Sequence, residues 1–130
     1  MQNFLFMISW LEKNSKLSSG ITIFCAVAIF VISSLKFEGV SSSGLFSVIY
    51  HFSAFFCLSF FLFISSVRGK KNKKIFFLSV LISLIYGVLD ELHQYFVPGR
   101  TSAVFDIGIN SLGILFSSLI YTIRLNYQKL

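Results

Sequence analysis

The chain has 130 residues, of which 55% are hydrophobic and only 12% charged. A soluble globular domain carries roughly 25% charged residues, so a water-soluble fold of this size could not bury so much apolar surface. The net charge of +6 does not indicate a nucleic-acid partner, because five of the eleven basic residues fall in one run, 68–74, between two long apolar segments. Such a run is typical of a topology signal, with contact to anionic lipid as the alternative.

The first eleven residues are too short to span a bilayer, which takes about 20 helical residues. Phe4, Leu5, Ile8 and Leu11 share one helical face. We therefore expect residues 1–16 to form an interfacial helix and a cytoplasmic lead-in.

Four later segments are long and apolar enough to cross a membrane. The first could be mistaken for a signal peptide, but it has no good small-residue cleavage site, so we expect it to be a retained helix. Cys25 and Cys57 lie inside apolar segments and are expected to be buried small hydrophobes. The sequence predicts an all-α fold, a polytopic transmembrane helical bundle that forms a single domain over 1–130. Its helices are expected at about 20–37, 44–67, 75–97 and 102–123.

The basic residues predict the orientation of this bundle. If both termini are cytoplasmic, nine of the eleven basic residues lie inside, and only Lys36 and Arg100 lie outside. This asymmetry follows the positive-inside rule and predicts a multi-pass protein of the cell membrane with both termini in the cytoplasm.

The third and fourth predicted spans are joined by Val97-Pro98-Gly99-Arg100. Proline followed by glycine favours a type II turn, so we expect a tight hairpin on the outer side. Glu91 and Asp106 are equally far from the centre of this turn in sequence, which predicts that both lie roughly 11 Å below it. Asp90 is one residue deeper, and His51 lies at a similar depth in the second span.

Each helix of the hairpin carries a stripe of polar and small residues at 100° per residue. Small residues let helices approach closely, so we expect the two stripes to face each other. His93 points away from its stripe and is expected to be an interfacial side chain. The stripes consist of Ser83, Gly87, Asp90, Glu91 and Gln94 on the third span, and of Ser102, Asp106, Asn110, Gly113 and Ser117 on the fourth.

Three carboxylates beside a histidine in one membrane layer exceed what helix packing requires, because each costs several kcal/mol there. Hydrogen-bonded packing between helices is the alternative, and we prefer it for the serines. Arg100 precedes a helix start, where a guanidinium and free amides suit an anion; snorkelling to head groups is its alternative. The candidate catalytic residues are His51, Asp90, Glu91 and Asp106, and the candidate substrate-binding residues are Gln94, Arg100 and Asn110.

No residue is assigned as a metal ligand, because the spacing matches no known metal motif. A histidine and three carboxylates could nevertheless hold a divalent ion, which stays an alternative while the cofactor is unknown.

The segment Asp90-Glu91-Leu92-His93-Gln94, followed by Pro98-Gly99-Arg100 and then by Asp106, Asn110 and Gly113, resembles the VanZ-like family. Its pattern is Asp-Glu-x-x-Gln, Pro-Gly-Arg and then Asp, Asn and Gly on the next helix, and His51 matches too. The resemblance covers about residues 45–120 and implies a multipass membrane protein of a family named for glycopeptide (teicoplanin) resistance. The chain is short for that family, which leaves room for a second copy or a membrane partner subunit.

These patterns favour a site for the head group of an envelope lipid or a cell-wall precursor in the outer leaflet. The site would bind this head group or modify it as a membrane-embedded hydrolase or transferase; whether the protein is an enzyme stays open. The alternatives are a proton-linked transporter or flippase, and a structural or resistance-accessory membrane protein. The inner halves of the predicted spans, rich in Phe, Leu and Ile, count against a transport path.

Overall fold

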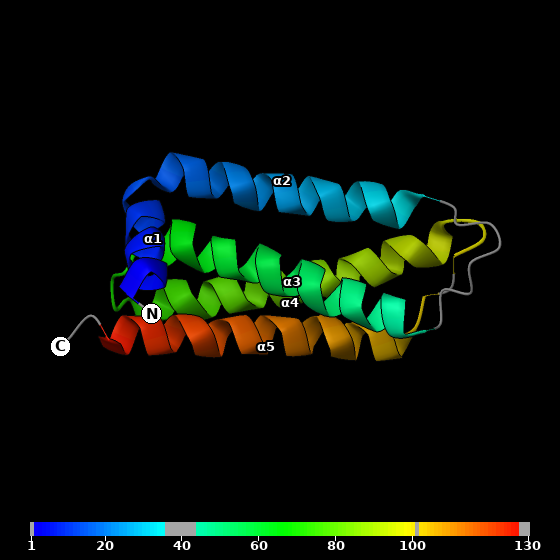
Figure 1. Cartoon of the computed structure of the whole chain (residues 1–130). Helices are drawn as coiled ribbons and strands as arrows, with labels where there is room; N and C mark the ends of the chain where they lie inside the picture. Colours follow the sequence, from blue (N-terminus) through cyan, green and yellow to red (C-terminus); the bar gives the residue numbers. More distant parts are fainter. Residues whose placement is uncertain (1, 36–43, 101, 128–130) are drawn as a thin grey trace.

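In the computed structural model, which describes residues 2–35, 44–100 and 102–127, the chain folds into five helices and the described part contains no strand. The predicted all-α fold is confirmed. Four of the helices are long and apolar enough to span a membrane. They lie side by side in an elongated bundle, and the short first helix folds across one end (Figure 1). The helices are α1 (Gln2–Lys13), α2 (Ser15–Ser34), α3 (Leu45–Val67), α4 (Lys73–Phe96) and α5 (Val104–Tyr127).

Two predicted spans differ from the observed helices by more than two residues at an end. The span expected at 20–37 is α2, which begins five residues earlier, after Asn14, and ends at Ser34; residues 36 and 37 lie outside the described ranges. The span expected at 102–123 begins at Val104 and continues to Tyr127. The helix continues past 123 because Arg124 is buried against Glu12 within the fold, and so the charge does not mark the end of the helix.

The two ends of the bundle differ in charge. Helix α1, the C-terminal end of α5 and the loop between α3 and α4 lie at one end, here called the basic end (Figure 1). The turn between α4 and α5 lies at the other, here called the hairpin end. Gly99 has a φ of +83°, and the Arg100 N–H donates to the Val97 carbonyl at 3.1 Å, as the predicted type II turn requires.

Helix α3 is the centre of the bundle and packs against each of the other four helices. A Cβ at Gly113 of α5 would collide with the backbone carbonyl oxygen of Phe52 on α3. A Cβ at Gly87 of α4 would meet the Asn110 side chain at 3.4 Å, which is ordinary contact. The expected packing of the α4 stripe on the α5 stripe is therefore only partly right: the closest approach is between α5 and α3, because Gly113 faces α3.

Much of the outer surface is apolar, as expected where helices face lipid. Large side chains such as Phe24, Phe77 and Phe105 are well exposed. The prediction of buried cysteines was wrong for Cys57, which is exposed, while Cys25 is half-buried. Cys57 faces outward because the membrane allows an apolar side chain on this surface.

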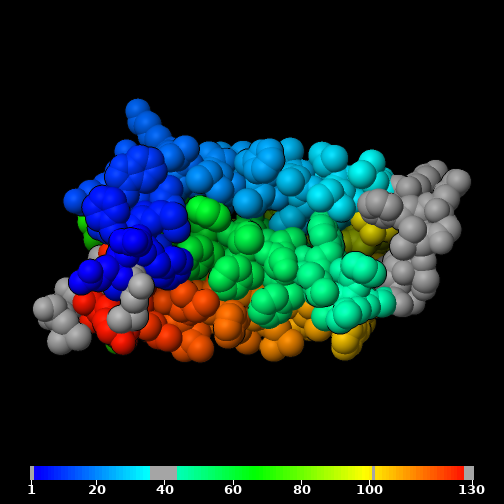
Figure 2. All heavy atoms as spheres, viewed as in Figure 1, coloured from blue at the N-terminus to red at the C-terminus, as the bar shows by residue number. Residues whose placement is uncertain are grey.

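Helix α1 folds over the basic end of the bundle (Figure 2). Its Ile8 and Leu11 are buried in a cluster with Phe63 and Ile64 of α3. Phe4, which the sequence placed on the same face, is 45% exposed. A helix is present as predicted, but its apolar face is fully buried only from Ile8 onward, with Leu5 half-buried.

Candidate functional site

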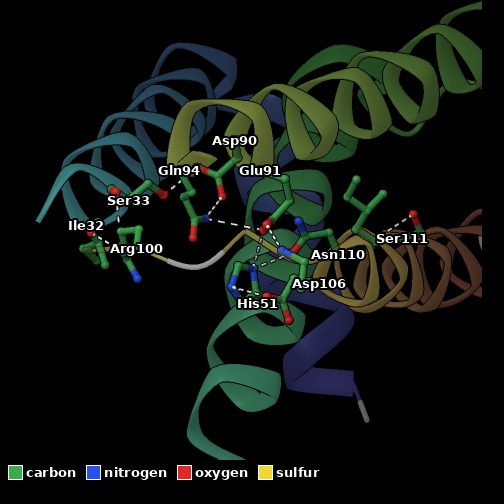
Figure 3. A network of polar contacts seen from close by, with 12 residues as sticks. Ile32, Ser33, His51, Asp90, Glu91, Gln94, Arg100, Asp106, Asn110 and Ser111 are labelled. Carbon is green, nitrogen blue, oxygen red and sulfur yellow. Dashed lines mark hydrogen bonds and ion pairs between the residues drawn. The ribbon is translucent and has the colours of Figure 1, made fainter. Parts of the chain in front are cut away.

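Three ionisable side chains from three helices meet near the hairpin end. His51 of α3 lies 3.5 Å from Glu91 of α4 through its Nδ1 and 3.9 Å from Asp106 of α5 through its Nε2. His51 and Glu91 are buried, and the Asp106 side chain is 13% exposed. Figure 3 shows these side chains converging from their separate helices. The structure thus brings together residues that the sequence placed at one depth.

Asn110 is one helical turn from Asp106 and points into the same cluster (Figure 3). Its Oδ1 lies 3.0 Å from His51 Nδ1. Because an amide oxygen can only accept, Nδ1 is the donor in this contact, and in the neutral imidazole the lone pair would then lie on Nε2, which faces Asp106. The Nδ2 of Asn110 is buried and has no hydrogen-bond partner within the described residues.

Asp90 points to a different neighbour from Glu91. Its Oδ1 accepts a hydrogen bond of 2.5 Å from the Ser33 hydroxyl of α2, and its Oδ2 accepts one of 2.9 Å from Gln94 Nε2. Gln94 also reaches Glu91 Oε1 at 3.4 Å. Asp90 and Gln94 therefore link α2 to the cluster around His51, and Gln94 connects the two adjacent carboxylates.

Two partners of the carboxylates, the Ser33 hydroxyl and the Ala103 backbone N–H, were not predicted. Ser33 lies near the hairpin end of α2, at a depth similar to Asp90, but depth alone does not show which helices are neighbours. The backbone N–H of Ala103 donates to Glu91 Oε2 at 3.4 Å. Residue type gives no sign of a backbone donor, since almost every residue has an N–H. The only sequence signal is the predicted start of a helix here, where the first N–H groups lack partners within the helix.

Arg100 follows the turn and bonds to α2. Its Nη2 donates to the Ile32 carbonyl at 2.5 Å, and its Nε donates to the Ser33 carbonyl at 3.3 Å. These carbonyls belong to the last turn of α2, where a cation is favourable to the helix dipole. The guanidinium thus holds the end of α2 beside α4, with Ser33 in reach of Asp90.

His93 lies away from the cluster, as its position on the helix predicted. Its Nε2 is 2.9 Å from the Ser34 hydroxyl, and its ring stacks at a tilt against Phe30 with 4.7 Å between centroids. It packs against α2 and is not part of the site.

A groove of about 390 Å³ between α4 and α5 reaches Glu91 from the outer surface. Its walls include Leu92, Tyr95 and Val104, which are all well exposed, and Ala103. The groove is mainly apolar and lies in the hairpin half of the bundle. A molecule with an apolar body could therefore approach the buried Glu91 carboxylate from the side of the bundle.

Carboxylates beside an imidazole can exchange protons with a bound molecule, because neighbouring like charges separate their proton affinities. The same three side chains, His51, Glu91 and Asp106, each offer a donor atom within 4.8 Å of the others, and in the described part of the chain they form the group that could hold a metal ion. The arrangement therefore supports acid–base chemistry, ion binding or both.

Four apolar spans around a buried polar cluster define a multi-pass membrane protein with a candidate site inside the bundle. The model of the VanZ/LLP1 family matches residues 4–125, and the chain belongs to this family. The match confirms the resemblance predicted from the sequence. No curated protein and no solved structure matches the chain.

Proposed function

We propose that this VanZ-family protein binds the polar head group of a membrane lipid or lipid-linked cell-wall precursor and modifies it, as a hydrolase or transferase. The convergence of His51, Glu91, Asp106 and Asn110 carries this proposal, since buried acids within a membrane usually serve a site or a pathway. The groove between α4 and α5 supports a lipid in particular, because its walls are apolar and it ends at Glu91.

The proposed side of action is the outer leaflet. Lys13, the basic run 68–74 and Arg124 gather at the basic end of the bundle, where α1 and the C-terminal end of α5 lie. By the positive-inside rule this end is cytoplasmic, so the hairpin end faces outward.

In this proposal, His51, Glu91 and Asp106 donate and accept protons at the reacting head group. Asp90 would tune Glu91 through Gln94, which bonds to both carboxylates. The buried Nδ2 of Asn110 would donate to an oxygen of the substrate. Arg100, which lies at the hairpin turn, is the residue proposed to contact an anionic head group.

The packing supports this proposal over a transport path. One turn inward from His51 and Asn110 lie Phe55 and Ile114, both fully buried. Together with Leu58 and Ile29 they form an apolar layer across the bundle. A proton or ion path would have to cross this layer.

The test compares Asp106→Asn with His93→Gln in vesicles that contain phosphatidylglycerol and a polyisoprenyl diphosphate, with the lipids followed by mass spectrometry. The parent should release or transfer a head group, and Asp106→Asn should lower the rate by at least about 100-fold, as expected for a lost acid or base. Asp106→Asn should unfold at the same temperature as the parent or higher, because a buried charge is removed.

His93→Gln is the matched control and should keep the rate, because His93 lies outside the cluster. Two outcomes contradict the proposal. One is a parent that leaves both lipids unchanged. The other is a large loss of thermal stability in Asp106→Asn, which would favour a purely structural role for the acids.

A further inference from the structure

The donor set of the cluster is that of a divalent metal site. One ring nitrogen of His51 and one carboxylate oxygen each of Glu91 and Asp106 come from three different helices and lie within 4.8 Å of one another. One imidazole nitrogen and two carboxylate oxygens are typical ligands of Zn²⁺ and Mn²⁺. Sequence spacing cannot reveal such a site, because each helix supplies a single ligand.

The neighbours of these side chains hold them as metal ligands usually are held. Metal-binding histidines commonly donate their second N–H to a carbonyl or carboxylate. Here the Asn110 Oδ1 accepts from His51 Nδ1 at 3.0 Å, which leaves Nε2 to bind an ion beside Asp106. Glu91 is held in turn by the Ala103 N–H and by Gln94.

An independent observation points to an oxygen ligand in the cluster. Asn110 is 1% exposed, and its Nδ2 has no hydrogen-bond partner in the described part of the chain. A buried unsatisfied donor costs about 1–3 kcal/mol, so a partner oxygen is expected. A water on the ion, or a phosphate oxygen bound to it, would be such an acceptor.

The charges favour a cation of charge two. Glu91 and Asp106 each pair with His51, which can carry one positive charge at most. Two buried carboxylates in a membrane are costly unless they are compensated. A divalent ion compensates both and leaves the imidazole neutral, which is the form that binds metals.

The distances allow one ion after a small contraction. Zn²⁺ holds nitrogen and oxygen ligands at about 2.0–2.2 Å, which separates the ligand atoms of a tetrahedron by roughly 3.3–3.6 Å. His51 Nε2 and Asp106 Oδ2 are 3.9 Å apart, and the three ligand atoms lie within 4.8 Å of one another, so the side chains would have to close by up to about 1 Å onto an ion.

We infer that His51, Glu91 and Asp106 bind one divalent cation of the Zn²⁺ or Mn²⁺ type, with a position left for an oxygen of a phosphate-bearing lipid head. This inference deepens the proposed function and rests on it only for the identity of that oxygen ligand. With the ion bound, His51, Glu91 and Asp106 would act as its ligands in place of the direct proton transfer proposed above. Three protein ligands and one open position are the pattern of catalytic zinc sites. The ion would neutralise charge on the head group when bound.

The test uses the full chain without a histidine tag, purified in detergent and stripped with EDTA. It is dialysed against Zn²⁺ or, separately, Mn²⁺, and the bound metal is measured by mass spectrometry. The parent should hold about one ion per chain. His51→Gln and Asp106→Asn should each bind at least about tenfold more weakly. His93→Gln is the matched control and should bind like the parent.

Thermal unfolding of each variant without metal shows that weaker binding is not loss of fold. The parent should also unfold at a higher temperature with the ion than without it, and Asp106→Asn should lose this shift. Absence of bound metal, or equal binding by the parent and Asp106→Asn, would overturn the inference.

The two proposals fail separately. If the parent modifies lipid after EDTA treatment and binds no ion, the metal inference is wrong and the lipid function stands. If the ion binds at these residues and neither lipid is changed or retained, the metal site stands and the lipid function is wrong.

Discussion

At the scale of single residues, Gly113 is the position where the fold leaves least room. A Cβ there would collide with the Phe52 backbone, which cannot move aside as a flexible side chain could. Gly113→Ala should therefore destabilise the protein by about 1–3 kcal/mol. Gly108→Ala is the matched control on the same helix, because nothing lies within 4 Å of its Cβ position. It should be neutral or stabilise by up to about 1 kcal/mol. Thermal unfolding in detergent measures both, and equal unfolding temperatures would contradict the packing of α5 on α3.

The sequence predicts the depth of the carboxylates in the site but not all of their partners. Distance from the Pro98–Gly99 turn was enough to place Glu91 and Asp106 at one depth, because a helix rises regularly. Depth does not show which neighbouring helix each of two adjacent side chains contacts. Asp90 and Glu91 share a broad polar arc, yet one bonds to Ser33 on α2 and the other meets His51 on α3. That difference depends on where α2 packs, which no local pattern contains.

At the scale of elements, Arg100 fastens the end of α2 to the turn between α4 and α5. Its two donors bond to two successive carbonyls, and an ammonium cannot reproduce this planar fork. Arg100→Lys should lower the unfolding free energy by about 1 kcal/mol, and Arg100→Ala should lower it further. Lys16→Ala, an exposed change at the other end of α2, is the control and should have little effect. If Arg100→Lys unfolds like the parent, the contacts with α2 contribute no stability.

Anion binding by Arg100 remains a separate prediction, tested by lipid binding of the same variants.

Helix α1 is tied to the basic end by a buried ion pair. Glu12 Oε2 accepts from Arg124 Nη2 at 3.2 Å, and Glu12 Oε1 accepts from the Tyr121 hydroxyl at 2.9 Å. Removing one partner of a buried pair costs about 3–5 kcal/mol, so Glu12→Ala should destabilise strongly. Lys13→Ala changes the exposed next residue and should have little effect. Circular dichroism on heating measures the difference, and similar curves for the two variants would show that α1 is not held by this pair.

The elements themselves were largely predictable, because long apolar runs read directly as spans. Their ends were less so. The last predicted span ends near residue 123, whereas Arg124 is buried against α1 and the helix continues to Tyr127. The expected pairing of two small-residue stripes was only partly right for a related reason. Both stripes exist, but Gly113 faces α3, a segment that is distant in the sequence.

At the scale of the whole molecule, the described chain has a polar cluster toward each end of the bundle. Between them lie apolar core residues and a few hydrogen-bonded serines, such as Ser59 and Ser117. His51 and the acids lie near the hairpin end, and Glu12, Tyr121 and Arg124 lie at the basic end. The start of α2 and the end of α5 lie at the same end because the number of spans is even (Figure 1). The outward direction of the hairpin end is inferred from the distribution of basic residues alone. This orientation determines which leaflet would supply a lipid to the groove.

Cysteine labelling in intact cells tests this orientation. In a Cys25→Ser, Cys57→Ser background, Gly44→Cys places a thiol at the hairpin end, where Gly44 is exposed, has extended backbone and has nothing within 4 Å of its Cβ position. Lys70→Cys places one in the loop at the basic end, where Lys70 is exposed. An impermeant thiol reagent should label Gly44→Cys at once and Lys70→Cys only after the membrane is opened, because most basic residues are expected inside. Labelling of Lys70→Cys in intact cells, with Gly44→Cys protected, would invert the protein. The groove at Glu91 would then open to the cytoplasmic leaflet. The protein would have to bind a lipid-linked precursor there, before the precursor crosses to the outer leaflet.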